Sequence, residues 1–185
     1  NLDKQRIAFW ARIIGKFMKL KVVGVLAYDS ITSEFGTKRN IFGGSATYFA
    51  ISSSYLSNNV RITGAIGKDF NRDDLDILSS RGINIDGVET LDLNTFKWEG
   101  KYETNAPNEA ITLSNSIIKG EPNVLESYKP ILYSKNENKS ESYSLFLANA
   151  DPEHQLDLIN QMDKRAKLIG LDTMDFWINN SAESV

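Results

Sequence analysis

Two adjacent glycines at the start of a helical pattern constrain the fold of this chain more than any other feature. Gly43 and Gly44 are followed at once by apolar residues at helical spacing, from Ala46 to Leu56. Adjacent glycines allow a tight turn and a close approach of the backbone to a ligand. The N–H groups at a helix start can donate hydrogen bonds to an oxygen-rich ligand. A plain loop-to-helix turn gives the same pattern, so the glycines alone do not identify a binding site.

Strand-like apolar runs flank this turn on both sides. Residues 20–27 are apolar on both faces, which is typical of a central parallel strand, and Asp29 follows just past their end. Residues 60–66 form a second run, which leads into Gly67-Lys68-Asp69. This alternation of strands and helices favours an α/β fold. Ligands of open α/β sheets bind at the carboxyl ends of strands, so the Asp29 carboxylate can accept hydrogen bonds from hydroxyl groups of a ligand. A cap of the following turn is the alternative.

The order of these motifs closely resembles the N-terminal half of the ribokinase-like (PfkB) carbohydrate kinases. In that family a strand leads to a sugar-binding Asp, a Gly-Gly turn opens a helix, and a Gly-x-Asp follows the next strand. An Arg-Gly-Ile-Asp-like turn comes later, as Arg81-Gly82-Ile83 does here. The resemblance covers roughly residues 19–178. It implies a three-layer, Rossmann-like, ribokinase-type fold with a small β lid, of which residues 18–185 are the N-terminal part.

The resemblance implies an ATP- and Mg²⁺-dependent kinase that phosphorylates a hydroxyl of a sugar or sugar-like small molecule. The family carries its catalytic base in a later Gly-Ala-Gly-Asp-like segment, and the sequence given stops at Val185 before any such segment. It has no Gly-x-x-x-x-Gly-Lys-Ser/Thr loop either. We therefore expect a C-terminally truncated piece that contains no catalytic residue and is inactive alone. A sugar-binding or regulatory module without catalysis stays open as an alternative.

The substrate-binding residues that the resemblance implies lie at the glycine turn and at strand ends. They are Asp29, Gly43, Gly44, Ser45 and Tyr48, followed in second rank by Asn149, Asp151 and Asp172. Tyr48 and Ala27 stand where the family often has Asn, so two amide contacts to the substrate are missing. Because Tyr48 offers a hydroxyl and a flat ring instead, a nucleoside (adenosine-like) kinase is an open alternative. Asp151 precedes Pro152, and the capping of a helix alone accounts for it.

A strictly alternating segment predicts the lid. Residues 95–103 alternate so that Phe96, Trp98 and Tyr102 share one face of a strand. Residues 109–113 are a plausible partner strand, so the lid strands are expected at about 95–113. The aromatic face can cover a sugar or pack against a partner lid in a homodimer. Packing against the body of the domain is about equally expected.

The remaining periodic segments complete the alternation of strands and helices. Helices are predicted at 45–57, 71–81 and 152–165, strands at 143–149 and 167–172, a loop or short hairpin at 30–42, and a surface loop at 134–141. The helix from 152 is expected to bury Leu156, Ile159 and Met162. The last strand, near Asp172, is expected to have an unpaired edge.

Composition and charge exclude several function classes. The chain of 185 residues has a net charge of −3, no cysteine and one histidine, His154. We expect no nucleic-acid partner, no thiolate or histidine metal site and no Ser-His-Asp triad. Residues 1–17 are a charged apolar extension, too short for a membrane span and without a signal-peptide cleavage site. Our hypothesis is that this extension is not native and the protein is cytoplasmic; a helix at a membrane surface is the alternative.

Overall fold

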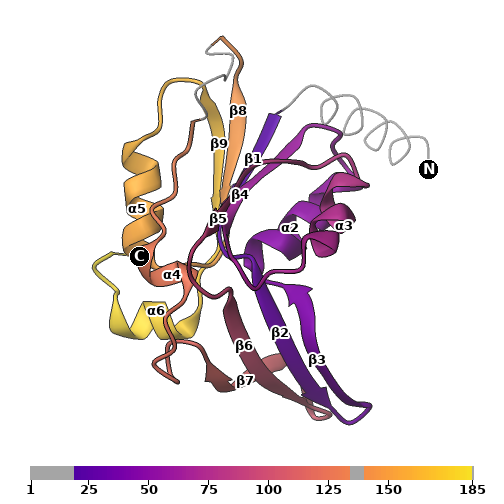
Figure 1. The fold of residues 1–185 in the computed structure, drawn as a ribbon. Helices are drawn as coiled ribbons and strands as arrows, with labels where there is room; N and C mark the ends of the chain where they lie inside the picture. Colours follow the sequence, from indigo (N-terminus) through magenta and orange to yellow (C-terminus); the bar gives the residue numbers. More distant parts are fainter. Residues whose placement is uncertain (1–18, 134–139, 185) are drawn as a thin grey trace, which may run out of the picture.

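The computed structural model describes residues 19–133 and 140–184, which form a central sheet and a smaller second sheet (Figure 1). The central sheet is parallel, in the order β5-β4-β1-β8-β9. Its strands are β1 (Lys19–Val23), β4 (Val60–Gly67), β5 (Asn84–Leu91), β8 (Tyr143–Leu147) and β9 (Ala166–Leu171). The predicted extension 1–17 and residues 134–139 of the predicted surface loop lie outside the described residues.

Helices cover both faces of the central sheet and complete three layers (Figure 1). One face carries α2 (Ser45–Ser54), the 3₁₀ turn η1 (Arg72–Leu75) and α3 (Asp76–Ser79); the other carries α4 (Val124–Ser127) and α5 (Pro152–Asn160), and α6 (Asp175–Asn180) follows β9. Successive residues of β1 alternate between the layers: Val22 packs with Ala46 and Ala50, whereas Val23 packs with Leu158. The predicted three-layer α/β fold is confirmed.

The strand order places a topological switch point at β1. The chain adds β4 and β5 on one side of β1 and later adds β8 and β9 on the other side. Ligands of such sheets bind outside the carboxyl ends of the strands at this point, because the connections diverge there and leave a crevice. The glycine turn, residues 43–44, lies at this edge, because Gly44 directly precedes α2 and Ala46 donates its N–H to Val25, just past β1.

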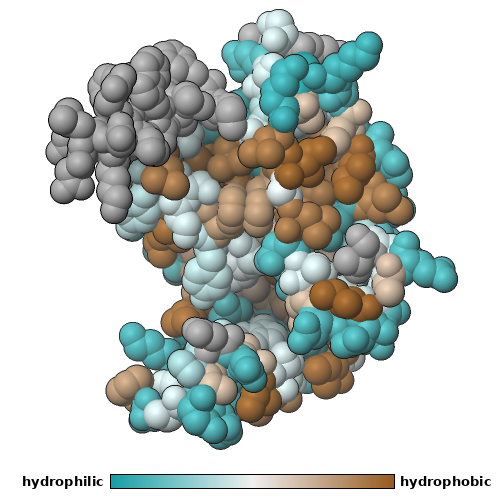
Figure 2. Space-filling model, turned by 180° about the vertical axis from the view of Figure 1, so that it is seen from behind, coloured by the Kyte–Doolittle hydropathy of each residue, from teal (hydrophilic) through white to brown (hydrophobic). Residues whose placement is uncertain are grey.

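The second sheet is the expected lid, and it is larger than two strands. Its order is β3-β2-β6-β7, with β2 (Ala27–Ser33), β3 (Gly36–Gly43), β6 (Phe96–Glu103) and β7 (Ala106–Asn115). The hairpin of β2 and β3 contains residues 30–42, for which the sequence predicted either a loop or a short hairpin. The lid extends away from the central sheet (Figure 1), and the surface is hollowed where the two parts meet (Figure 2).

One predicted strand is two strands in different sheets. We expected residues 20–27 to be one central strand with Asp29 just past its end, but β1 stops at Val23 and β2 of the lid starts at Ala27. The chain bends at Gly24, where a Cβ atom would lie 2.8 Å from the Cβ of Ala148. The apolar pattern continues across the bend because both strands are buried at their junction. Asp29 is therefore a residue of the lid.

The inward face of α5 was predicted wrongly. Leu156 and Ile159 are exposed, while Gln155 and Leu158 are buried. Gln155 takes an inward position because its amide donates to the backbone oxygens of Ala148 and Asp172, at 3.1 and 3.0 Å, and so satisfies carbonyl groups at the ends of two strands. The helix ends at Asn160, and Met162, just past its end, is half-buried against the core, in line with its predicted burial.

The central sheet and its helices, called the body below, have apolar side chains exposed on the side of β9. Leu168, Ile169 and Leu171 of β9 are 62, 46 and 42% exposed. β9 pairs only with β8 among the described strands, as expected for an unpaired edge. Brown side chains gather on the face of the body seen in Figure 2. Within the part of the chain that the structure describes, no helix has the length and apolar character needed to cross a membrane.

Candidate functional site

The centre of the candidate site is the carboxylate of Asp29, which β2 holds against the start of α2. Its Oδ2 accepts the N–H of Gly44 at 3.3 Å and the hydroxyl of Tyr48 at 3.2 Å. Burial raises the pKa of Asp29, and these two hydrogen bonds oppose the rise. The other oxygen, Oδ1, has no hydrogen bond within residues 19–133 and 140–184 and is not among their enclosed unpaired atoms. It is thus available to a hydroxyl donor.

Both glycines of the turn are required by close approaches. A Cβ atom on Gly43 would lie 2.1 Å from Oδ2 of Asp29, so only glycine lets the carboxylate approach the turn. Gly44 has a φ of 95°, and its Cβ would lie 2.4 Å from the carbonyl oxygen of Val25. The sequence predicted unpaired N–H groups here, but Asp29 and Val25 occupy those of Gly44 and Ala46.

Ser45 joins the start of α2 to the end of β8. Its hydroxyl donates to the backbone oxygen of Asn149 at 2.8 Å and accepts from the N–H of Val25 at 3.4 Å. The contact fixes the helix start at the switch point of the sheet. Asn149 therefore lies at the same edge. Its side-chain oxygen is enclosed and has no hydrogen-bond partner among the described residues.

The other second-rank candidates make their described hydrogen bonds to residues other than Asp29 and its two donors. Asp151 caps α5, since its Oδ1 accepts the N–H of Glu153 at 2.9 Å. Asp172 has an exposed side chain, and its described hydrogen bonds are made by its backbone, with Leu147 and Gln155. The structure therefore brings together Asp29, the glycine turn and Tyr48, and leaves the two later carboxylates outside this group.

Tyr48 presents a ring beside the carboxylate. Its side chain is 48% exposed, and burial together with the charge of Asp29 raises its pKa to about 12. Tyr102 of β6 adds to this rise, which places the lid close to the first turn of α2. At neutral pH the phenol keeps its proton, so it acts toward Asp29 as a hydrogen-bond donor.

The predicted aromatic face of the lid is the face that carries Asp29. β2 and β6 are parallel, and Asp29 is the register partner of Trp98. Residues aligned in register share a face, so Phe96, Trp98 and Tyr102 face the same side as the carboxylate. The Trp98 ring lies over Gly100, where a Cβ would be 2.0 Å from it, and Nε1 donates to Thr112 at 3.0 Å. Trp98 thus packs on its own sheet.

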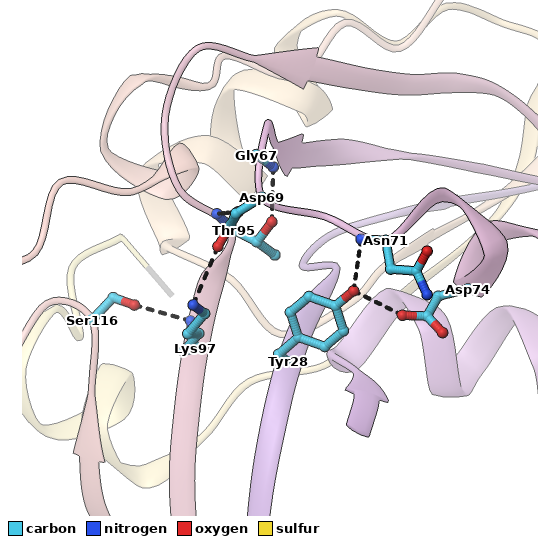
Figure 3. Close-up of polar contacts among 8 residues, drawn as sticks. All are labelled: Tyr28, Gly67, Asp69, Asn71, Asp74, Thr95, Lys97 and Ser116. Carbon is cyan, nitrogen blue, oxygen red and sulfur yellow. Dashed lines mark hydrogen bonds and ion pairs between the residues drawn. The ribbon is translucent and has the colours of Figure 1, made fainter. Parts of the chain in front are cut away.

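A polar network behind Asp29 was not among the predicted site residues. Tyr28, Asp69 and Thr95 connect the two lid strands β2 and β6 to the loop after β4 (Figure 3). The Gly67-Lys68-Asp69 motif was visible in the sequence. Its partners were not, because Thr95 lies 26 residues after Asp69.

The described residues contain no cluster of protein ligands for a metal ion. No cluster of three or more His, Asp or Glu side chains with metal-binding geometry occurs in residues 19–133 and 140–184. No phosphate-binding loop was found in the sequence. No residue described here is therefore assigned to ATP or to a metal ion.

Comparisons with known proteins identify the fold. No family model and no curated protein sequence matches the chain. Among solved structures, a nucleoside kinase of Burkholderia thailandensis in complex with inosine matches 83% of this chain and 51% of its own, with a TM-score of 0.63 and 17% identity. A ribokinase of Cryptococcus neoformans in complex with ADP matches 86% and 51% of the two chains, with a TM-score of 0.60 and 14% identity.

An archaeal structure agrees with these two. A nucleoside kinase of Methanocaldococcus jannaschii, a member of the ribokinase family, matches 92% of this chain and 57% of its own, with a TM-score of 0.60 and 20% identity. The chain thus has a ribokinase-type fold and spans about half the length of each of these structures.

Proposed function

We propose that this chain carries the acceptor-binding part of an ATP-dependent kinase that phosphorylates a hydroxyl of a sugar or sugar-like molecule. The observation that carries the proposal is the carboxylate of Asp29, which is buried at the switch point with one oxygen held by Gly44 and Tyr48. Its other oxygen can accept a hydroxyl. The ribokinase-type fold supports the reaction class.

The role that we assign to Asp29 is binding and orientation. A hydrogen bond to a carboxylate contributes about 1.5–3 kcal/mol in net terms, whereas one between uncharged groups contributes about 0.5–1.5 kcal/mol. A fixed carboxylate can therefore hold one hydroxyl so that a neighbouring one faces the phosphoryl donor. ATP supplies the phosphoryl group, which is the chemistry expected of this fold. No catalytic base is assigned within the described residues.

The proposal is tested on the protein made from the complete reading frame that contains these residues. ATP consumption with Mg²⁺ and a panel of sugars is measured, together with calorimetric binding of each sugar. Asp29→Asn should weaken acceptor binding by about 10- to 100-fold, the factor for one charged hydrogen bond. Asp157→Asn, which changes an exposed carboxylate of α5, should have no effect. Equal behaviour of the two variants would refute the role of Asp29, and no binding or turnover with any compound would overturn the kinase proposal.

A nucleoside acceptor is the second candidate, and Tyr48 is the observation that favours it. Its half-exposed ring lies next to the carboxylate, on the side where the lid aromatics face the site. A sugar hydroxyl on Asp29 would bring an attached base near such rings. The Burkholderia nucleoside kinase with this fold is in complex with inosine.

Inosine and free ribose separate the two candidates. Stacking of a base on an aromatic ring contributes about 1–3 kcal/mol, so Tyr48→Ala should weaken inosine binding roughly 5- to 100-fold if the base stacks there. Tyr48→Phe keeps the ring but removes the hydroxyl that donates to Asp29, so it measures the loss that comes from the donor alone. Beyond that loss, Tyr48→Ala should weaken ribose binding far less than inosine binding. Tyr55→Ala, which removes an exposed ring at the end of α2, is the matched control. If the loss of affinity beyond that of Tyr48→Phe were equal for inosine and ribose, a sugar would be favoured over a nucleoside as the acceptor. The predicted homodimer through the lid stays a prediction.

A further inference from the structure

The loop after β4 is bound to the start of lid strand β6, at Thr95 just before the strand and at Lys97 within it. Oδ1 of Asp69 accepts the N–H of Thr95 at 2.6 Å, and Oδ2 pairs with Nζ of Lys97 at 3.2 Å. In return, the hydroxyl of Thr95 accepts the N–H of Gly67 at 2.9 Å. Figure 3 shows these groups meeting between the end of β4 and the lid. The side chain of Thr95 is fully buried, so this contact is part of the packed structure.

The same loop also holds the neighbouring lid strand β2. The Tyr28 hydroxyl accepts the N–H of Asn71 at 2.9 Å and donates to Oδ2 of Asp74 at 2.7 Å (Figure 3). Its ring stacks on Phe70, with the centroids 5.1 Å apart. Burial and the hydrogen bond to Asp74 raise the pKa of Tyr28 to about 12, so the donor keeps its proton at neutral pH.

Register places both contacts directly behind Asp29. Tyr28 pairs with Lys97, and the next pair along the two parallel strands is Asp29 with Trp98. Neighbouring residues of a strand point to opposite faces. Tyr28 and Lys97 therefore face the loop after β4, while Asp29 faces α2 and the candidate site.

The packing around Asp69 leaves the loop after β4 and the start of β6 little freedom to move relative to each other. A Cβ atom on Gly67 would lie 2.3 Å from the backbone nitrogen of Thr95, so the two segments touch at the backbone. The N–H of Lys68 donates to the oxygen of Leu93 at 3.0 Å. Burial disfavours the charge of Asp69, but the hydrogen bonds from Thr95 and Lys97 outweigh it and lower the pKa of Asp69. The carboxylate is thus charged and doubly bound at neutral pH.

We propose that Asp69 is a positioning residue for the acceptor site. By holding Thr95 and Lys97 it fixes the lid sheet on the body and so sets the place of the Asp29 carboxylate, which belongs to that sheet. The inference rests on the proposed role of Asp29 in binding the acceptor. Asp69 itself makes no contact with the acceptor, since it lies on the opposite face of the lid.

Three variants and a matched control test this role. Asp69→Ala removes both contacts, Asp69→Asn keeps an oxygen for Thr95 while it removes the charge, and Lys97→Met removes only the ion pair. Asp92→Asn is the control, because Asp92 pairs with Lys68 at 2.7 Å in the same region but is exposed. Amide hydrogen exchange is followed strand by strand, and binding of ribose and inosine is measured by calorimetry.

Positioning predicts a local effect. Asp69→Ala should speed exchange in β2 and β6 by on the order of tenfold while exchange in β8 stays unchanged, and Asp69→Asn and Lys97→Met should fall between it and the unsubstituted protein. The affinity for whichever of ribose and inosine binds should fall by a comparable factor. Asp92→Asn should change neither the exchange rates nor this affinity. A purely structural role would speed exchange in β8 as well.

The outcomes separate this proposal from the proposed function. Unchanged exchange in β2 and β6, or equal acceleration in β8, overturns the positioning role. If Asp69→Ala does not fold, Asp69→Asn and Lys97→Met decide the same question. If the unsubstituted protein binds neither probe, the acceptor-site proposal fails for these ligands, and the exchange pattern still decides whether Asp69 fixes the strand that carries Asp29.

Discussion

The Tyr48 hydroxyl donates a 3.2 Å hydrogen bond to Oδ2 of Asp29 across the joint between the body and the lid. Tyr48 belongs to α2, which packs on the central sheet, and Asp29 belongs to β2 of the lid. The bond therefore links the two parts at the candidate site. It also supplies one of the two donors that keep a buried carboxylate solvated by protein.

Tyr48→Phe should raise the pKa of Asp29 further. The substitution removes a donor that favours the charged carboxylate and leaves the ring, so burial is opposed only by the N–H of Gly44. Titration of the Asp29 carboxyl carbon by NMR measures the change. Tyr102→Phe, which leaves the bond intact, is the control. A pKa of Asp29 that is unchanged or lower in Tyr48→Phe would contradict the prediction.

Asp29→Asn should stabilise the fold at neutral pH while it weakens acceptor binding. Burial raises the folded-state pKa of Asp29 above its ordinary value of 3.8, so the folded state binds the proton more tightly than the unfolded state. Stability is consequently lost as the pH rises from 3.8 through the raised pKa. The gain in melting temperature of Asp29→Asn should be small below this window and larger above it. A gain in melting temperature that shrinks as the pH rises would contradict the prediction.

Gly44→Ala should destabilise the protein more than Gly82→Ala. Both glycines have positive φ, of 95° and 74°, but no atom lies within 4 Å of a Cβ on Gly82. Gly82→Ala should therefore cost about 1–2 kcal/mol of unfolding free energy from the backbone alone. Gly44→Ala adds the clash with Val25 and should cost more. Urea titrations compare the two, and equal costs would mean that the close approach contributes nothing.

Asp151→Ala should lower stability without affecting the acceptor site. The side chain caps α5 through the N–H of Glu153, and loss of such a cap costs about 1 kcal/mol. Asp157→Ala, on an exposed face of the same helix, is the control for stability. Calorimetry with ribose and inosine should give the same affinities for Asp151→Ala and the unsubstituted protein. A large loss of affinity would restore Asp151 to the site.

The sequence predicted the strand and helix order because its apolar runs and glycines are local signals. The Gly43-Gly44 turn, the helix behind it and the alternating segment of β6 each carry their own pattern. Residues 20–27 were wrongly predicted to be one strand. A chain that passes from one buried strand into another shows no change in hydropathy where the first strand ends. Only the packing of Gly24 on Ala148 reveals the bend.

The polar partners could not be predicted for a different reason. Gln155 looks like a surface residue in a helix, yet it faces inward because strand ends nearby leave carbonyl oxygens to satisfy. Asp69 accepts the backbone N–H of Thr95, and the Thr95 hydroxyl accepts the backbone N–H of Gly67. Backbone donors are the same for every residue type except proline, so the sequence contains no pattern that pairs them.

The passage of the chain from β1 into β2 has a consequence for protein engineering. Because Asp29 is built into the lid, a lid grafted from another protein of this fold would bring its own equivalent of this carboxylate. The two donors, Gly44 and Tyr48, would stay behind with the host. A chimera would therefore bind well only if the boundary were drawn after the first turn of α2, so that carboxylate and donors are exchanged as one unit.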